Sequence, residues 1–280
     1  MKRRKAIIVS TIALAVLATW PLRAVAQSFV PGQQFYNGAS TDEDETSATS
    51  TGDGPDVKTG EMVFLLHGIG KGRMDMAPMA RHLRKHGYAV VNWHYQSTKY
   101  KLEDLADKLA AEIERFPEYK IHFVTHSMGG IVVRTFLSRH EMSNLGRIVM
   151  IAPPSQGAEL AKFMGNWPLY KFLFGPAGQQ LKPGEEGTCA SAGIPGCEFG
   201  IIAGGTGSDT GINPLLPGDN DGTVTVACTK LDGAQDFALL PYPHPLIQMM
   251  PRTTRLTRTF LEHGYFEQPI EPVGEDLTGQ

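Results

Sequence analysis

The sequence has few cysteines, no apolar run long enough to cross a bilayer and no basic stripe, and each absence narrows the possible functions. Its three cysteines have spacings that fit no zinc motif. The longest apolar segment, Ala6–Trp20, has fifteen residues, whereas a spanning helix needs roughly 20. Beyond residue 26 there are 29 acidic residues against 21 basic ones, a net charge of −8, so nucleic acid is not an expected partner.

The first 26 residues have the order of a secretory signal. Basic residues at positions 2–5 precede the apolar segment, and Ala24 and Ala26 supply the small side chains expected before cleavage after Ala26. The alternative is an uncleaved membrane anchor, which the short apolar segment disfavours. The sequence therefore predicts a secreted or periplasmic protein.

The remaining chain has the length of one globular domain with polar segments at both ends. Because Ser40–Asp56 has no large apolar side chain to bury, residues 27–60 are expected to form a disordered acidic linker. Residues 61–266 are expected to fold, and 267–280 to form a flexible tail.

The three cysteines would meet an oxidising compartment after export. Cys189 and Cys197 lie in one Gly/Pro-rich stretch with seven residues between them, which favours a local disulfide. Cys228 is then expected to be a small, buried apolar residue.

Short apolar runs alternate with amphipathic segments along the expected domain. The runs are nearly continuous, as in strands covered on both faces, and span residues 63–66, 88–91, 121–124, 148–151, 199–202 and 237–240. Between them, Met76, Met79 and Leu83 share one helical face, and residues 102–113 carry a second one. This alternation predicts an α/β fold with a doubly wound, mostly parallel sheet of about six strands.

Residues 154–198 interrupt the alternation over a length that exceeds an ordinary connection. Its second half is rich in glycine, and its first half carries Phe163, Trp167, Tyr170, Phe172 and Phe174. A long insertion often covers an active site, which predicts a cap or lid. A surface segment with its own small core is the alternative.

The third apolar run is followed by the segment Thr-His-Ser-Met-Gly-Gly and then by a helical pattern. A nucleophile elbow has this order and needs small residues two positions before and after its serine. Gly129 meets the second requirement, whereas Thr125 replaces the first glycine. Ser127 is therefore the candidate nucleophile, with a simple helix N-cap as the alternative.

Acyl transfer to a serine passes through an oxyanion, which backbone N–H groups must face. Met128, at the start of the elbow helix, is one candidate donor. The other is Ile69, in the glycine-containing turn of residues 67–70 after the first apolar run. This turn matches neither G-x-G-x-x-G nor the P-loop, which disfavours a nucleotide site.

Together, the His-Gly turn and the His-Ser-Met-Gly-Gly elbow resemble the α/β-hydrolase superfamily, and within it bacterial lipases and esterases with an H-S-M-G-G elbow. The resemblance covers nearly all of residues 61–266. It implies the α/β-hydrolase fold, with catalytic residues in the chain order serine, acid, histidine.

The resemblance implies His244 as the base, because it follows the last apolar run within Pro-Tyr-Pro-His-Pro, where the family places this residue. A structural loop histidine is the alternative. The other histidines after the elbow, His140 and His263, are expected at exposed helix ends.

The acid is expected after the preceding apolar run. Related enzymes have a similar Asn-Asp-Gly-x-Val segment, which favours Asp221; Asp219 is the competing choice and Asp209 a third. As a calcium loop, this segment would need a glutamate where Lys230 stands. We expect neither a metal nor a cofactor.

These residues predict a serine hydrolase of carboxylic esters, in which His244 accepts the Ser127 proton and Asp221 orients the ring. His67 and His126 are expected to be packing residues. The aromatic insertion favours a lipid or other apolar acyl ester and allows peripheral membrane contact through the lid. Acyl transfer, or thioester or amide cleavage, would use the same triad, and a non-catalytic envelope binding protein is the alternative from another class.

Deleting residues 27–56 is expected to leave the melting temperature and catalytic turnover almost unchanged, because this segment contributes no apolar surface to a core. Calorimetry of the truncated and full mature chains checks this. A large drop in melting temperature would contradict the proposed domain boundary.

Overall fold

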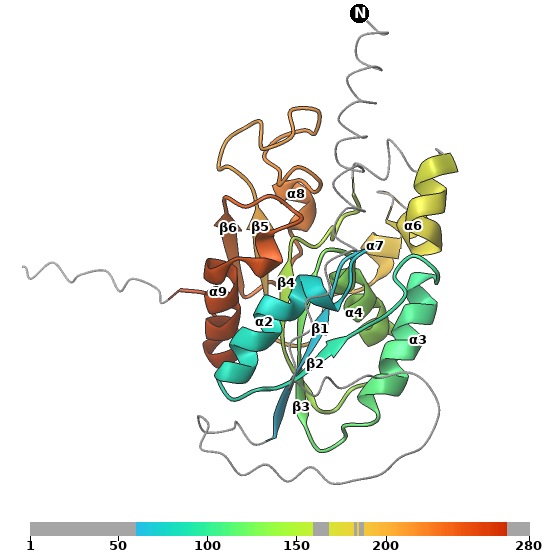
Figure 1. Cartoon of the computed structure of the whole chain (residues 1–280), viewed down its shortest axis with the longest axis vertical. Helices are drawn as coiled ribbons and strands as arrows, with labels where there is room; N and C mark the ends of the chain where they lie inside the picture. Colours follow the sequence, from blue (N-terminus) through green and yellow to red (C-terminus); the bar gives the residue numbers. More distant parts are fainter. Residues whose placement is uncertain (1–59, 159–167, 182–183, 185–187, 268–280) are drawn as a thin grey trace, which may run out of the picture. The chain divides into compact units, whose positions relative to one another are not determined.

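Among the residues that the structure describes, six strands form one sheet in which every neighbouring pair is parallel (Figure 1). The computed structural model describes residues 60–158, 168–181, 184 and 188–267. The strands are β1 (Glu61–Leu66), β2 (Ala89–Trp93), β3 (Lys120–His126), β4 (Leu145–Ile151), β5 (Phe199–Gly204) and β6 (Asp236–Leu240). Their order across the sheet is β2-β1-β3-β4-β5-β6, which confirms the predicted α/β sheet.

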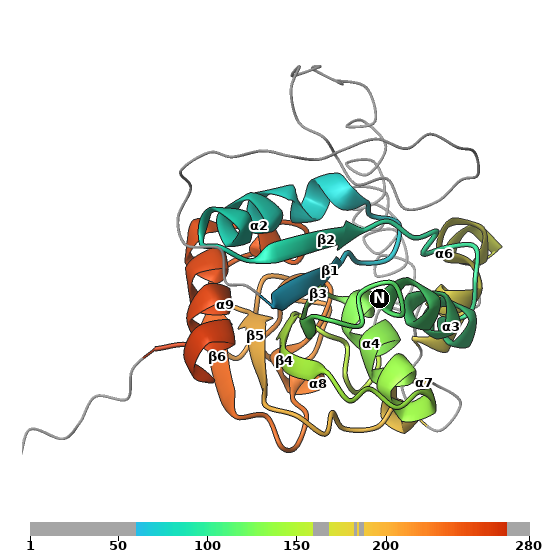
Figure 2. The ribbon, with the colours of Figure 1, turned by 90° about the horizontal axis from the view of Figure 1, so that it is seen from below.

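Helices α2 (Arg73–Lys85) and α9 (Pro251–His263) cover one face of the sheet (Figure 2). Val63 and Leu65 of β1 are fully buried in a cluster with apolar side chains of both helices. The apolar face predicted for residues 76–83 is therefore the face with which α2 packs on the sheet.

Helices α3 (Leu102–Ile113) and α4 (Met128–Arg139) cover the opposite face (Figure 2). The ring of Phe64 packs on Phe123 of β3, and Phe123 packs on Phe136 of α4, with centroid distances of 6.1 and 6.2 Å. Because successive strand residues point to opposite faces, an uninterrupted apolar run fills both layers.

The remaining helices of the described residues are short or interrupted. They are α6 (Pro168–Gln180), α7 (Thr188–Ser191), α8 (Val226–Thr229) and the 3-10 helix η1 (Ile247–Met249). The chain departs from helical geometry within α6 at Gly175, where φ is 60° and ψ is −160°. A Cβ built there would lie 1.7 Å from the Thr98 carbonyl oxygen, so only glycine fits.

The described part of the 154–198 insertion is anchored on α3. Gln180 accepts a hydrogen bond from the Leu102 N–H and donates one to Glu103, both at the start of that helix. Phe163 and Trp167 lie outside the described residues, so the cap remains a prediction.

The three cysteines are free thiols, so the disulfide predicted between Cys189 and Cys197 is absent. Cys189 is buried in α7 with its thiol directed at the Gln180 carbonyl, whereas Cys197 lies beside Glu198 at the start of β5. Burial raises the pKa of Cys189 to about 12 and that of Cys197 to about 11, which keeps both protonated.

The predicted signal, nearly all of the predicted linker and the predicted tail lie outside the described residues. Within the described ranges, no helix combines the length and hydropathy that crossing a membrane requires.

Replacing Gly129 with alanine is expected to lower the free energy of unfolding by about 1–3 kcal/mol, because α4 begins in direct contact with the end of β1. A Cβ at Gly129 would lie 2.7 Å from the Leu66 carbonyl oxygen and 3.0 Å from that of His67. Urea unfolding measures the change. Gly196→Ala is the matched control, since its Cβ would meet nothing within 4 Å, and equal stability of the two variants would contradict this packing.

Candidate active site

Ser127 occupies a sharp turn between β3 and α4. Its φ of 54° and ψ of −125° are unfavourable for a residue with a Cβ, and such strain persists only where the surroundings enforce it. The Ser127 N–H donates to the Ile151 carbonyl of β4 at 2.8 Å, and its own carbonyl accepts from Gly130 N at 3.0 Å. These bonds fix the side chain at the carboxyl edge of the sheet, as expected for an elbow.

Gly130 explains how threonine is accommodated at the first small position of the elbow. Thr125 is fully buried, and a Cβ built on Gly130 would lie 3.2 Å from its hydroxyl oxygen. The side chain of Thr125 therefore occupies the space left by the missing Cβ of Gly130, three residues after the serine. The departure at Thr125 does not disturb the turn.

His244 reaches Ser127 from the loop after β6. Its Nε2 lies 3.0 Å from Ser127 Oγ, and its Nδ1 lies 2.6 Å from Asp221 Oδ2. With Nδ1–H donating to the carboxylate, Nε2 is left as the acceptor for the serine hydroxyl. The exposed fractions of Ser127, Asp221 and His244 are 7, 1 and 8%, so the pair of hydrogen bonds is shielded from water.

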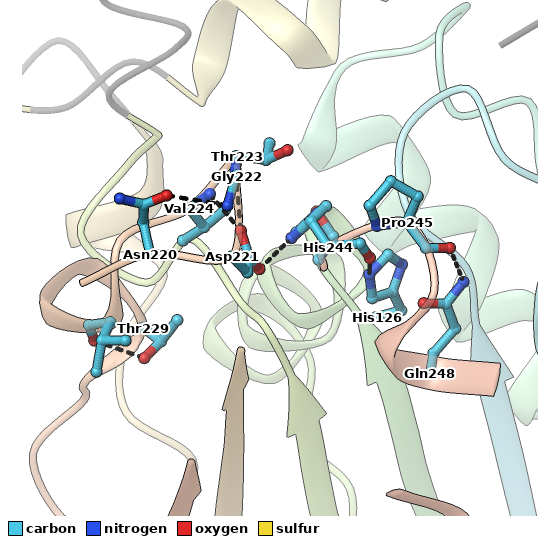
Figure 3. A network of polar contacts seen from close by, with 12 residues as sticks. His126, Asn220, Asp221, Gly222, Thr223, Val224, Thr229, His244, Pro245 and Gln248 are labelled. Atoms are coloured by element: carbon cyan, nitrogen blue, oxygen red, sulfur yellow. Dashed lines mark hydrogen bonds and ion pairs between the residues drawn. The ribbon is translucent and has the colours of Figure 1, made fainter. Parts of the chain in front are cut away.

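Asp221 is held by the turn that follows it (Figure 3). Its second oxygen, Oδ1, accepts hydrogen bonds from the backbone N–H groups of Thr223 at 3.0 Å and Val224 at 2.7 Å. A buried carboxylate requires such partners, because an unpaired charge there would be costly. The Asp221 backbone carbonyl accepts a hydrogen bond from the His244 N–H at 2.9 Å, so two hydrogen bonds join Asp221 and His244.

Asp219, the competing choice of acid, faces another loop. Its carboxylate accepts hydrogen bonds from the backbone N–H groups of Thr206 and Gly207, each at 2.8 Å. Burial opposes ionisation, but these bonds together outweigh it and lower the pKa of Asp219. Asp209 lies exposed in the same loop. Of the three carboxylates, only Asp221 contacts the His244 ring.

The turn that holds Ile69 lies directly against Ser127. A Cβ built on Gly68 would lie 3.2 Å from the Ser127 Cβ, so glycine permits the close approach. Within the described ranges, the backbone N–H groups of Ile69 and Met128 have no hydrogen-bond acceptor. Both therefore remain available to an oxyanion formed at Ser127.

Two residues that the sequence patterns did not single out support this turn. The Ser97 hydroxyl accepts from the Gly70 N–H at 2.9 Å, and the Tyr95 hydroxyl donates to the His67 carbonyl. The ring of His67 stacks on Tyr95 at 4.2 Å, and burial lowers the pKa of His67 to about 4. His67 is therefore neutral near pH 7.

Asn220 is the third residue that the patterns missed. Its fully buried side chain accepts from the N–H groups of Asn213 and Gly222 and donates to the carbonyls of Thr210, Asn213 and Gly218. These bonds close the loop that carries the neighbouring Asp221. The segment Asn-Asp-Gly could have predicted this role, since Asn side chains in turns commonly form hydrogen bonds with nearby backbone groups.

The other histidines after the elbow lie away from Ser127. His140 caps α4 and contacts Asp107, and His263 ends α9. In the part of the chain that the structure describes, no three His, Cys, Asp or Glu side chains are grouped as a metal site would need.

The family model described as the alpha/beta hydrolase fold matches residues 61–175, a range that contains Ser127 but neither Asp221 nor His244. No curated protein matches the sequence. Among solved structures, the chain is similar to a lipase of Bacillus licheniformis in its mature form, with 22% identity, a TM-score of 0.57 and coverage of 77% of this chain and 96% of that one. It is also similar to a phospholipase of Legionella pneumophila, with 16% identity and a TM-score of 0.52. This match covers 66% of this chain and 53% of the phospholipase. These findings show that the chain has the α/β-hydrolase fold.

Replacing Asp221 with alanine is expected to slow the reaction of Ser127 with an alkyl fluorophosphonate about 10³- to 10⁴-fold, because the His244 ring loses its orienting partner. Labelling rates followed by mass spectrometry check this. Asp219→Ala is the matched control and should keep the rate within about threefold. A larger loss for Asp219→Ala than for Asp221→Ala would reverse the assignment of the acid.

Proposed function

We propose that the chain is a serine hydrolase that cleaves carboxylic esters through an acyl-enzyme intermediate. The observation that carries this proposal is the continuous line of contacts from Ser127 Oγ through the His244 ring to Asp221, with distances of 3.0 and 2.6 Å. A serine, an imidazole and a carboxylate in this geometry act as nucleophile, general base and orienting group. The superfamily match and the fold support hydrolase chemistry in general.

In the proposed acylation step, Ser127 Oγ attacks the ester carbonyl carbon while its proton moves to His244 Nε2. Asp221 stabilises the imidazolium that forms and holds its Nδ1–H. The N–H groups of Ile69 and Met128 donate to the carbonyl oxygen as it becomes negative. The proton on Nε2 then passes to the leaving alcohol oxygen as the ester C–O bond breaks.

In the proposed deacylation step, water takes the place of the alcohol. His244 Nε2 accepts a proton from the water as it attacks the acyl carbon, and returns that proton to Ser127 Oγ as the acyl–serine bond breaks. The products are a carboxylic acid and the free enzyme. Each oxyanion donor in such a site is worth roughly 10²- to 10³-fold in kcat.

Apolar side chains around the site support a lipid or other apolar acyl ester as substrate. Leu246 follows His244 by two residues and is 43% exposed. Met74, in the first turn of α2, is 79% exposed and follows the turn of residues 67–70, here called the oxyanion turn because it carries the proposed donor Ile69. Ile212 and Leu215 are also exposed, in the loop that leads to Asp221. Apolar residues exposed near the carboxyl edge of the sheet are suited to contact with acyl chains at a membrane surface.

The substrate class and cellular location form part of the same proposal. The names of the two similar structures, a lipase and a phospholipase, are consistent with an apolar ester. We further propose that residues 1–26 direct export, which would place the enzyme outside the cytoplasm.

Ser127→Ala and His244→Ala are each expected to lower kcat for p-nitrophenyl esters by roughly 10⁴- to 10⁶-fold, and the double variant hardly further, because the residues act as one unit. Steady-state kinetics with acyl chains from acetyl to palmitoyl measures the effect. A preference beyond about eight carbons would identify a lipase, whereas activity limited to short chains would indicate an esterase with a shallow pocket. Near-normal hydrolysis by a folded Ser127→Ala variant would overturn the proposed function.

A further inference from the structure

His126 touches three parts of the proposed site. It precedes Ser127 at the end of β3 and has an exposed fraction of 1%. Its Nε2 lies 3.1 Å from the backbone carbonyl oxygen of His244, and the centroids of the two rings are 4.8 Å apart (Figure 3). On the other edge of the ring, a Cβ built on Gly68 would lie 3.1 Å from Nδ1. One imidazole thus adjoins the nucleophile, the base and the oxyanion turn.

The contact with a carbonyl fixes the tautomer of His126. A carbonyl oxygen only accepts hydrogen bonds, so Nε2 must carry the proton and donate it. Nδ1 has no hydrogen-bond partner among the described residues. Burial lowers the pKa of His126 well below its usual value, and the nearby His244 and Lys71 lower it further. The ring is therefore neutral, with its one N–H committed to His244.

The backbone of His244 is held from both sides. Its N–H donates to the Asp221 carbonyl at 2.9 Å, and its carbonyl accepts from His126 at 3.1 Å. The imidazole of His244 reaches Ser127 Oγ from this residue, so its position follows from where these two bonds hold the backbone. Losing one of them leaves the base attached to the acid but free to move relative to the serine.

We propose that His126 is a positioning residue that sets the distance between His244 and Ser127 by donating its Nε2 proton to the His244 carbonyl. This inference rests on the proposed ester hydrolysis. His126 touches none of the reacting atoms. A packing role alone, as the sequence suggested, would require only the volume of its ring.

Two substitutions of similar length separate donation from packing. Glutamine and methionine have comparable unbranched side chains, but only glutamine carries an N–H donor. We expect His126→Met to lower kcat about 10- to 100-fold with KM within threefold, since displacing a catalytic group by about 1 Å costs that much. His126→Gln should recover kcat to within about fivefold of the wild-type protein.

His122 provides the matched control. It lies on the same strand and the same face, and it is also 1% exposed, but it contacts Arg147 and Glu61 at the opposite end of β3. His122→Met should lower stability without lowering kcat, which separates loss of a buried imidazole from loss of the contact with His244. Equal kcat losses in His126→Met and His126→Gln, or no loss in His126→Met, would overturn the positioning role.

A measurement on the unaltered chain keeps the inference testable if these variants fold poorly. Nitrogen-15 NMR of the histidine rings should show His126 as a neutral ring protonated on Nε2 between about pH 5 and 8. Normal ester hydrolysis by a wild-type protein whose His126 is protonated on Nδ1 would overturn the positioning role alone. Absence of hydrolysis of any tested ester by the wild-type protein would overturn the proposed function and, with it, the positioning role.

Discussion

The left-handed backbone at Ser127 is the constraint on which the rest of the site depends. Holding a residue with a Cβ at φ 54° costs about 1–3 kcal/mol, so neighbouring contacts must enforce the turn. The Ile151 carbonyl binds the Ser127 N–H, and Gly129 lets α4 begin against the end of β1. The turn places the serine hydroxyl at the edge of the sheet and leaves the Met128 N–H beside it.

The parallel sheet brings the partners to that edge. Every strand ends on the same side, so the loops after β1, β5 and β6 meet the turn that follows β3. Asp221 can be buried there because its carboxylate has three hydrogen-bond donors, namely two backbone N–H groups and His244. The carboxylate of Asp219, two residues earlier, instead accepts hydrogen bonds from the backbone N–H groups of Thr206 and Gly207 and closes the loop of residues 206–219.

Contacts between backbone and side chain tie these loops together. Tyr95 and Ser97 hold the turn of Gly68, Asn220 closes the loop before Asp221, and His126 binds the carbonyl of His244. Tyr95, Ser97 and His126 join segments that enter the site from different strands or loops, whereas Asn220 holds together the single loop between β5 and α8. None of these four residues takes part in the proposed reaction.

The sequence by itself determined the sheet, the elbow and the segments that carry the proposed base and acid. Strands covered on both faces must be apolar throughout, and the elbow requires a serine and small residues within five consecutive positions, so both leave local patterns. The sequence favoured Asp221 only through a family resemblance and left Asp219 open. The tertiary structure showed that Asp221 contacts the His244 ring and that Cys189 and Cys197 are unpaired. It also decided that His126 and Ser97 contact residues 118 and 27 positions away. The direction of a side chain depends on how distant segments pack together, and the spacing of residues along the chain does not predict that packing.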